Sequence, residues 1–161
     1  MSEDKRELER MKNMYKDFSQ KVDQVKRKGE ENLTTSRFVC SDSEDLSLTS
    51  KTYNYQGTVF SINMFRDNAR HFSYRYLLFE KDYEGKKTFC KVVFDNVNKD
   101  GAIVSRYNIT MLSKKGIMHK EISSDTFDGL EEDDRRLIMF IHECRSNARY
   151  CDYLEKVGVI K

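Results

Sequence analysis

Proline and tryptophan are both absent from this chain of 161 residues, and it contains no long apolar run. An average usage of about 5% would give roughly eight prolines, so the turns must rely on Gly, Asn, Asp and Ser. A membrane-spanning helix needs about 18 consecutive apolar residues, and an N-terminus with the sequence MSEDKR is too charged for a secretory signal. We therefore expect no membrane contact and a cytoplasmic location, with the nucleus as the alternative.

An excess of one charge is also lacking, because 29 Lys and Arg residues are balanced by 27 Asp and Glu residues. Nucleic-acid binding usually requires a basic face that displaces phosphate counterions. The main basic cluster, residues 26–28, follows Lys21 and is typical of a solvated helix end, where cations complement the helix dipole. The sequence therefore predicts no nucleic-acid partner.

Metal and redox motifs are missing as well. The four cysteines form no Cys-x-x-Cys pair, which leaves a zinc ribbon, a RING or a redox dithiol without support. His142, Cys144 and Cys151 have the residue types of metal ligands, but their spacing matches no common zinc module, so we expect ordinary packing there. The sequence accordingly predicts no bound metal and no cofactor.

Catalytic motifs are equally scarce. The seven glycines are isolated, so there is no phosphate-binding loop, and the sequence contains neither Gly-x-Ser-x-Gly nor His-Glu-x-x-His. His71, His119 and His142 each lie inside or beside an apolar pattern, which favours a structural or surface role. We identify no catalytic residue and expect a protein that is not an enzyme.

Residues 1–29 have the apolar spacing of an amphipathic, coiled-coil-like helix, and Gly29 is a natural stop. Such a short helix is marginal alone, so its apolar stripe must be buried. The stripe either pairs with a copy of itself, which would make the protein an oligomer, or packs on the chain's own globular part or on a different helix. It consists of Leu8, Met11, Tyr15, Phe18, Val22 and Val25.

The rest of the chain divides into a linker and a β domain. Residues 30–52 are polar, with one or two short extended pieces, and predict a linker. Across residues 53–122 apolar side chains alternate with polar ones, and turn residues separate five or six consecutive segments. This pattern predicts antiparallel strands in a sandwich or an open barrel, within a domain that spans residues 53–161. We favour a mainly β fold with an antiparallel β-sandwich.

The C-terminal segment of this domain is ambiguous. Apolar positions from 137 to 151 alternate at spacings of four and three, which is typical of an amphipathic helix. Residues 137–141, however, form a continuous apolar run that would serve equally well as a buried strand. We expect helical turns at residues 130–134 and 147–155 and leave residues 137–141 open between helix and strand.

Three segments carry a resemblance to a known family. HFSYRYLLFEK at 71–81, KTFCKVVF at 87–94 and RYNITM at 106–111 form an aromatic-rich strand, a glutamate-lysine hairpin, a Phe-containing strand and a Tyr-centred strand. This succession resembles the TRAF-like, substrate-binding domain of the seven-in-absentia ubiquitin ligases, and a helix ahead of the β domain is similar to the order in TRAF adaptors. The resemblance implies a TRAF-like sandwich and protein binding in the ubiquitin pathway. It does not imply ligase activity, because the RING and zinc fingers are missing.

Strand parity suggests where a partner would bind. Tyr107, Ile109 and Met111 share one face, which places Arg106 and Asn108 on the other, and Arg75 is opposite its tyrosine neighbours. We expect Arg75, Arg106 and Asn108 to bind an acidic or carbonyl-rich peptide through forked hydrogen bonds. The alternative is that these are simply solvated strand positions.

Two functional hypotheses follow from these patterns. The first is a non-catalytic adaptor whose β domain binds a protein or peptide, with oligomerisation through the N-terminal helix. The second is a small ligand-binding or enzymatic β fold that encloses a pocket. An apolar cavity with convergent polar groups would favour the second hypothesis.

Overall fold

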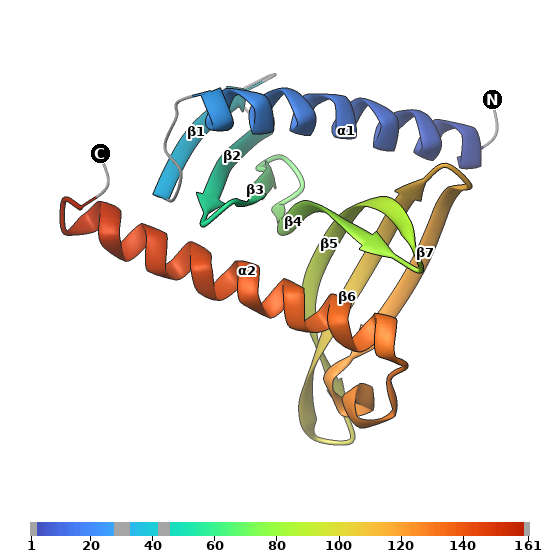
Figure 1. The fold of residues 1–161 in the computed structure, drawn as a ribbon. Coiled ribbons are helices and arrows are strands. Elements are labelled where there is room, and N and C mark those ends of the chain that lie inside the picture. Colours follow the sequence, from blue (N-terminus) through green and yellow to red (C-terminus); the bar gives the residue numbers. More distant parts are fainter. Residues whose placement is uncertain (1–2, 28–32, 42–45, 160–161) are drawn as a thin grey trace.

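The computed structural model describes residues 3–27, 33–41 and 46–159. Helix α1 (Glu3–Arg27) comes before the strands, and the short 3-10 helix η1 (Ser124–Gly129) and helix α2 (Glu132–Lys156) follow them. The strands are β1 (Leu33–Ser41), β2 (Leu46–Tyr55), β3 (Thr58–Asp67), β4 (Phe72–Tyr83), β5 (Lys86–Lys99), β6 (Ala102–Ser113) and β7 (Gly116–Ser123). The fold is mainly β with a helix ahead of the sheet, as the sequence predicts (Figure 1).

The seven strands form one antiparallel sheet in which every strand pairs with the next one in the chain. Tight turns make this meander possible without proline. At Glu84 and Gly85, which join β4 to β5, both residues have positive φ values, of 51° and 76°. Asp100 and Gly101 do the same between β5 and β6, as hairpin turns of this twist require.

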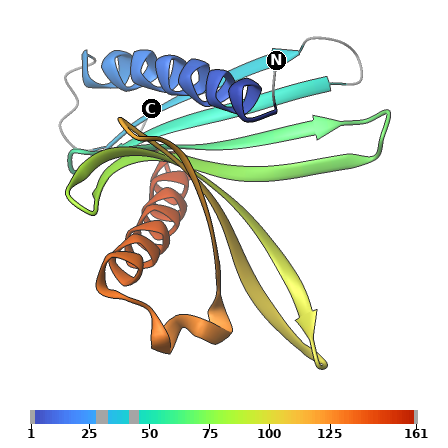
Figure 2. The ribbon, with the colours of Figure 1, turned by 90° about the vertical axis from the view of Figure 1, so that its right-hand side faces the viewer.

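Helices cover both faces of the sheet. Figure 2 shows α1 on one face of the curved sheet and α2 on the other. Tyr76 and Leu78 of β4 belong to the apolar cluster under α1, whereas Leu77 and Phe79 belong to the cluster under α2. The described strands therefore form a single sheet between two helices, where we expected two stacked sheets. Apolar side chains on both faces of a central strand fit either arrangement, because a helix buries such a face as well as a second sheet does.

The apolar stripe of α1 packs on the chain's own sheet. Met11, Phe18 and Val25 are buried, and the Phe18 ring lies 5.4 Å from the Phe89 ring of β5. Tyr15 donates a hydrogen bond to Glu80 of β4. Of the two alternatives for the stripe, the structure shows packing on the globular part, so pairing of these residues with a second copy would require α1 to leave the sheet.

Much of the predicted linker belongs to the sheet. Residues 33–41 and 46–55 form β1 and β2, while residues 30–32 and 42–45 lie outside the described residues. Most of β2 was predicted as linker because the side chains that it buries toward the α1 face are polar. Ser50, Thr52 and Asn54 are each at most 5% exposed, so the apolar alternation that marks a strand is missing.

The C-terminal segment that the sequence leaves open between helix and strand is a helix. Residues 137–141 lie within α2, which includes all of the predicted segment 147–155 but only residues 132–134 of the predicted segment 130–134. Leu137, Ile141, Cys144, Ala148 and Cys151 are buried against the sheet, which confirms the spacing pattern. Within the described part of the chain, neither helix has a stretch long and apolar enough to cross a membrane.

Candidate functional site

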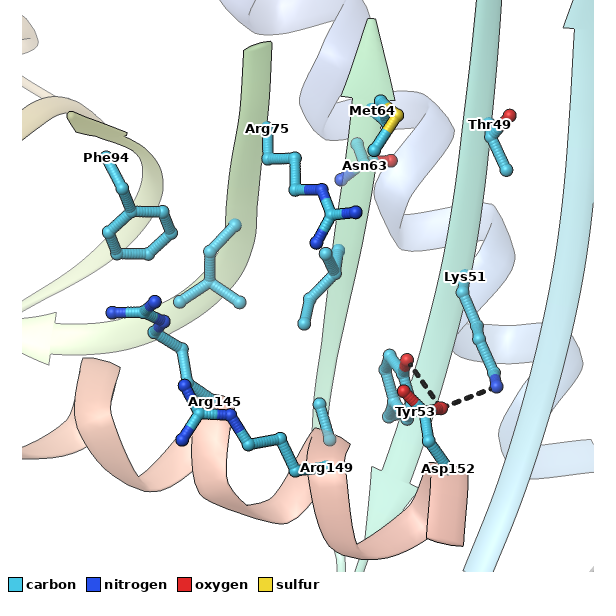
Figure 3. A pocket seen from close by; sticks show the side chains of 13 residues that line it. Thr49, Lys51, Tyr53, Asn63, Met64, Arg75, Phe94, Arg145, Arg149 and Asp152 are labelled. Carbon is cyan, nitrogen blue, oxygen red and sulfur yellow. Dashed lines mark hydrogen bonds and ion pairs between the residues drawn. The ribbon is translucent and has the colours of Figure 1, made fainter. Parts of the chain in front are cut away.

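A pocket of about 500 Å³ lies between α2 and the sheet face that α2 covers, and we name it the α2 pocket. Strands β2, β3, β4 and β5 line it on one side, and one face of α2 lines it on the other (Figure 3). Its α2 residues are Arg145 and the residues three, four and seven positions after it, Ala148, Arg149 and Asp152, so a single helix face presents them all. The pocket therefore depends on the packing of α2 across four strands.

Three arginines surround the α2 pocket. Arg75 extends from β4 toward the middle of the pocket, whereas Arg145 and Arg149 start from α2 (Figure 3). The guanidinium carbon of Arg145 lies 4.5 Å from the centre of the Phe94 ring, a cation-π contact that leaves its N–H groups available. Among the described residues, no carboxylate forms an ion pair with any of the three. The pocket therefore has an excess of positive charge.

The fourth cation of the pocket is neutralised. Lys51 Nζ lies 2.6 Å from Asp152 Oδ1 and 3.1 Å from Glu155 Oε2. Tyr53 donates a hydrogen bond of 3.0 Å to the same Asp152 oxygen. Burial, and then the Asp152 charge, raise the pKa of Tyr53 well above its usual range, so this hydroxyl keeps its proton. Lys51 and Tyr53 thus hold Asp152 at one end of the pocket.

The floor of the pocket is apolar. Leu77 is fully buried and Ala148 is 3% exposed, and Ile62, Met64 and Phe94 complete the surface. Ala148 lies between the two arginines of α2, and its single methyl group leaves open the volume that a longer side chain would fill. Arginines beside an apolar floor are suited to a ligand that has both an anionic and an apolar part.

The three residues predicted to bind a partner do not share a surface. Asn108 pairs with Val93, which in turn pairs with Tyr76. Because cross-strand partners lie on the same face, Asn108 and Arg106 are on the α1 face, while Arg75 is on the α2 face. The expectation of one binding surface is therefore wrong. Only Arg75 lines the α2 pocket.

Arg106 already has carboxylate partners. Its Nε and terminal nitrogen donate hydrogen bonds of 2.9 and 2.6 Å to the two Asp95 oxygens, and Glu121 lies 3.2 Å away. The bonds from Arg106 hold the pKa of Asp95 below its usual value. A bidentate pair of this kind uses the same two N–H groups that would bind a peptide carboxylate. We therefore interpret Arg106 as a residue that joins neighbouring strands of the sheet.

Sequence reasoning did not select Arg145 and Arg149. Their signal is spacing on α2, because positions 145, 148, 149 and 152 lie on one helix face. That signal becomes usable only after the segment is known to be one continuous helix. Lys51 was missed for a related reason, since β2 was assigned to a linker.

A second polar cluster, formed by Tyr83, Lys120 and Asp134, has the residue types of an acid-base site. Tyr83 and Lys120 each lie 2.7 Å from an Asp134 oxygen, and the two donors are 3.0 Å apart. Burial, followed by the bond to Asp134, raises the pKa of Tyr83. The pKa of Lys120 is also raised, because its bonds to Asp134 and Tyr83 outweigh its burial. These contacts join the start of α2 to β4 and β7.

Of the three residues considered as metal ligands, the two cysteines belong to the core and His142 is exposed. Cys144 and Cys151 are buried under α2, and His142 contacts the Tyr107 hydroxyl at 3.0 Å. Burial raises the pKa of Cys144 to about 12, which keeps its thiol protonated and unreactive. Within the described ranges, no group of three His, Cys, Asp or Glu side chains is placed to hold a metal ion.

Comparison of the chain with protein-family models, with curated proteins and with solved structures yields no match. The likeness to a TRAF-like domain accordingly stays an expectation from the sequence. Any assignment of function has to rest on the chemistry of the α2 pocket itself.

Proposed function

We propose that the protein binds a small organic anion in the α2 pocket and does not alter it chemically. The observation that carries this proposal is the set of three arginines around an apolar floor, for which the described residues supply no carboxylate partner. Cations gathered in one pocket repel each other, and an anion placed among them removes that repulsion. The volume of about 500 Å³ is within the range of pockets that bind small molecules.

The α2 pocket supports the second of the two sequence hypotheses in its ligand-binding form. An enzymatic form has less support, because the titratable pocket residues Lys51, Tyr53 and Asp152 are bonded to one another. The adaptor hypothesis, with its peptide partner and its role in the ubiquitin pathway, stays a prediction. Oligomerisation through α1 has less support, because the stripe is buried on the sheet.

A titration with hexyl sulfate tests the proposal. Amide NMR signals of pocket residues such as Leu77 and Ala148 should shift with saturation, and the double variant R145Q/R149Q should bind at least about tenfold more weakly, because each charge-assisted hydrogen bond contributes about 1.5–3 kcal/mol. R136Q is the matched control, since Arg136 is an exposed arginine of α2 outside the pocket. Equal affinity in the double variant, or shifts outside the pocket only, would contradict the proposal.

A further inference from the structure

We infer that the anion bound in the α2 pocket is a phosphate monoester whose ester group is apolar. The inference rests on the proposed function and narrows it to one class of ligand. It follows from the number of pocket arginines, from the sides of the pocket on which they start and from the apolar floor beside them.

Charge matching favours a dianion over a monoanion. Arg75, Arg145 and Arg149 have no carboxylate partner within the described part of the chain, whereas Lys51 is balanced by Asp152 and Glu155. A carboxylate or a sulfate ester brings one negative charge and leaves most of the repulsion among the guanidinium groups. A phosphate monoester brings about 1.5 to 2 charges at pH 7.

The placement of the arginines also suits a tetrahedral group. Arg75 approaches from the sheet, while Arg145 and Arg149 approach from α2 (Figure 3). A planar carboxylate has two oxygens in one plane, which fits a single arginine fork. A phosphate monoester has three terminal oxygens that point in different directions, and it can therefore accept hydrogen bonds from guanidinium groups on both sides.

The apolar floor indicates what the phosphate is attached to. Ile62, Met64 and Phe94 are half-buried and give the floor an apolar surface that water can reach, beside the fully buried Leu77. Inorganic phosphate would contact the arginines and leave this surface in water. An alkyl or aryl ester group would cover it, and each buried CH₂ would tighten binding about fourfold.

The second ionisation of the phosphate, near pH 6, gives the inference a distinctive pH dependence. The charged or titratable groups that face the pocket are Arg75, Arg145, Arg149, Lys51, Tyr53 and Asp152. Glu155 contacts Lys51, and burial, followed by the charge of Arg145, lowers the pKa of the nearby His142. A sulfate ester of the same length keeps one charge throughout, so its affinity shows how the titration of the protein groups alone affects anion binding.

Calorimetry on the full chain with hexyl phosphate, hexyl sulfate, hexanoate and inorganic phosphate tests the inference. At pH 7.5 hexyl phosphate should bind at least about tenfold more tightly than the other three, and its advantage over hexyl sulfate should fall several-fold at pH 5. If hexyl sulfate binds as tightly as hexyl phosphate, the assignment to phosphate esters is wrong while the proposed function stands. If none of the organic anions binds, the proposed function fails as well.

The variant R75Q tests whether Arg75 contacts the phosphate group itself or only attracts anions through its charge. R75Q should reduce the preference for hexyl phosphate over hexyl sulfate several-fold, with an unchanged circular dichroism spectrum. R70Q removes an arginine that is exposed and outside the pocket, and it should leave the preference unchanged. An unchanged preference in R75Q would overturn the inference.

Sedimentation with vesicles identifies the source of the phosphate. Co-sedimentation with phosphatidic acid vesicles, but not with phosphatidylcholine vesicles, would identify a lipid headgroup as the ligand. Binding of soluble hexyl phosphate without co-sedimentation would identify a soluble ester. Both outcomes support a phosphate monoester, whereas failure of both probes in the presence of hexyl sulfate binding would overturn it.

Discussion

At the residue scale, the least expected side chains are the polar ones buried on the α1 face of the sheet. Ser50 is 1% exposed, and its hydroxyl has no hydrogen-bond partner among the described residues. Its cross-strand neighbour Asn63 is also buried and donates a hydrogen bond of 3.1 Å to Ser61. Ser50 and Asn63 are therefore buried to a similar degree, but among the described residues only Asn63 has a side-chain hydrogen-bond partner.

This contrast predicts opposite effects of removing the two side chains. Ser50→Ala should leave the free energy of unfolding unchanged or raise it by about 1 kcal/mol, because a buried hydroxyl without a partner costs free energy. Asn63→Ala should lower it, because Ser61 would lose its donor and a cavity would form. Urea unfolding measures both. A loss of stability in Ser50→Ala as large as that in Asn63→Ala would show that Ser50 has a partner.

The pair of Asp95 and Arg106 predicts a pH dependence. The pKa of Asp95 is lower in the folded state than its ordinary value of about 3.9, because Arg106 donates hydrogen bonds to the ionised carboxylate. The pair thus stabilises the folded state above that ordinary value, and the contribution is lost as the pH falls through the folded-state pKa.

Asp95→Asn should therefore lose less unfolding free energy than the original chain between pH 5 and pH 2. Thermal unfolding at a series of pH values measures the difference. Asp128→Asn is a suitable control, since Asp128 is an exposed residue of η1. Parallel pH curves for the original chain and Asp95→Asn would mean that the pair contributes nothing in solution.

At the element scale, α1 is part of the core. Phe18 is 3% exposed and contacts Phe89, so Phe18→Ala should lower the free energy of unfolding by about 3–5 kcal/mol. Lys12→Ala, on the exposed side of α1, should change it by less than about 0.5 kcal/mol. Denaturant unfolding and light scattering together separate the two roles of the helix. If Phe18→Ala keeps its stability but changes the particle mass, the stripe serves association between chains.

Helices and strands could be predicted from the sequence where the side chains that they bury are apolar. The stripe of α1 and the alternation along β4 and β6 each follow the ordinary period of their structure, so both were visible in the sequence. β2 was not, because its inner face toward α1 carries Ser50, Thr52 and Asn54. The continuity of α2 was also hidden, since a run of five apolar residues fits a buried helix as well as a buried strand.

At the scale of the whole molecule, the candidate site could be predicted only in part. Arg75 was selected by its position between two tyrosines, but its partners were expected on β6. Which face an arginine shares with another strand depends on the register of every intervening pair, and a shift of one residue reverses the answer. Arg145 and Arg149 come from an element about seventy positions later in the chain, and sequence spacing alone does not show which sheet face that element covers.

The order of the elements also has a consequence for synthesis of the chain. Each strand pairs with the one made just before it, so the sheet can grow hairpin by hairpin while translation proceeds. The face that holds Leu77, Phe79 and Ile109, however, is covered by α2, which is translated after every strand. Translation proceeds at about 5–20 residues per second. A nascent chain therefore exposes this apolar surface to chaperones and to other nascent chains for seconds before α2 has been synthesised.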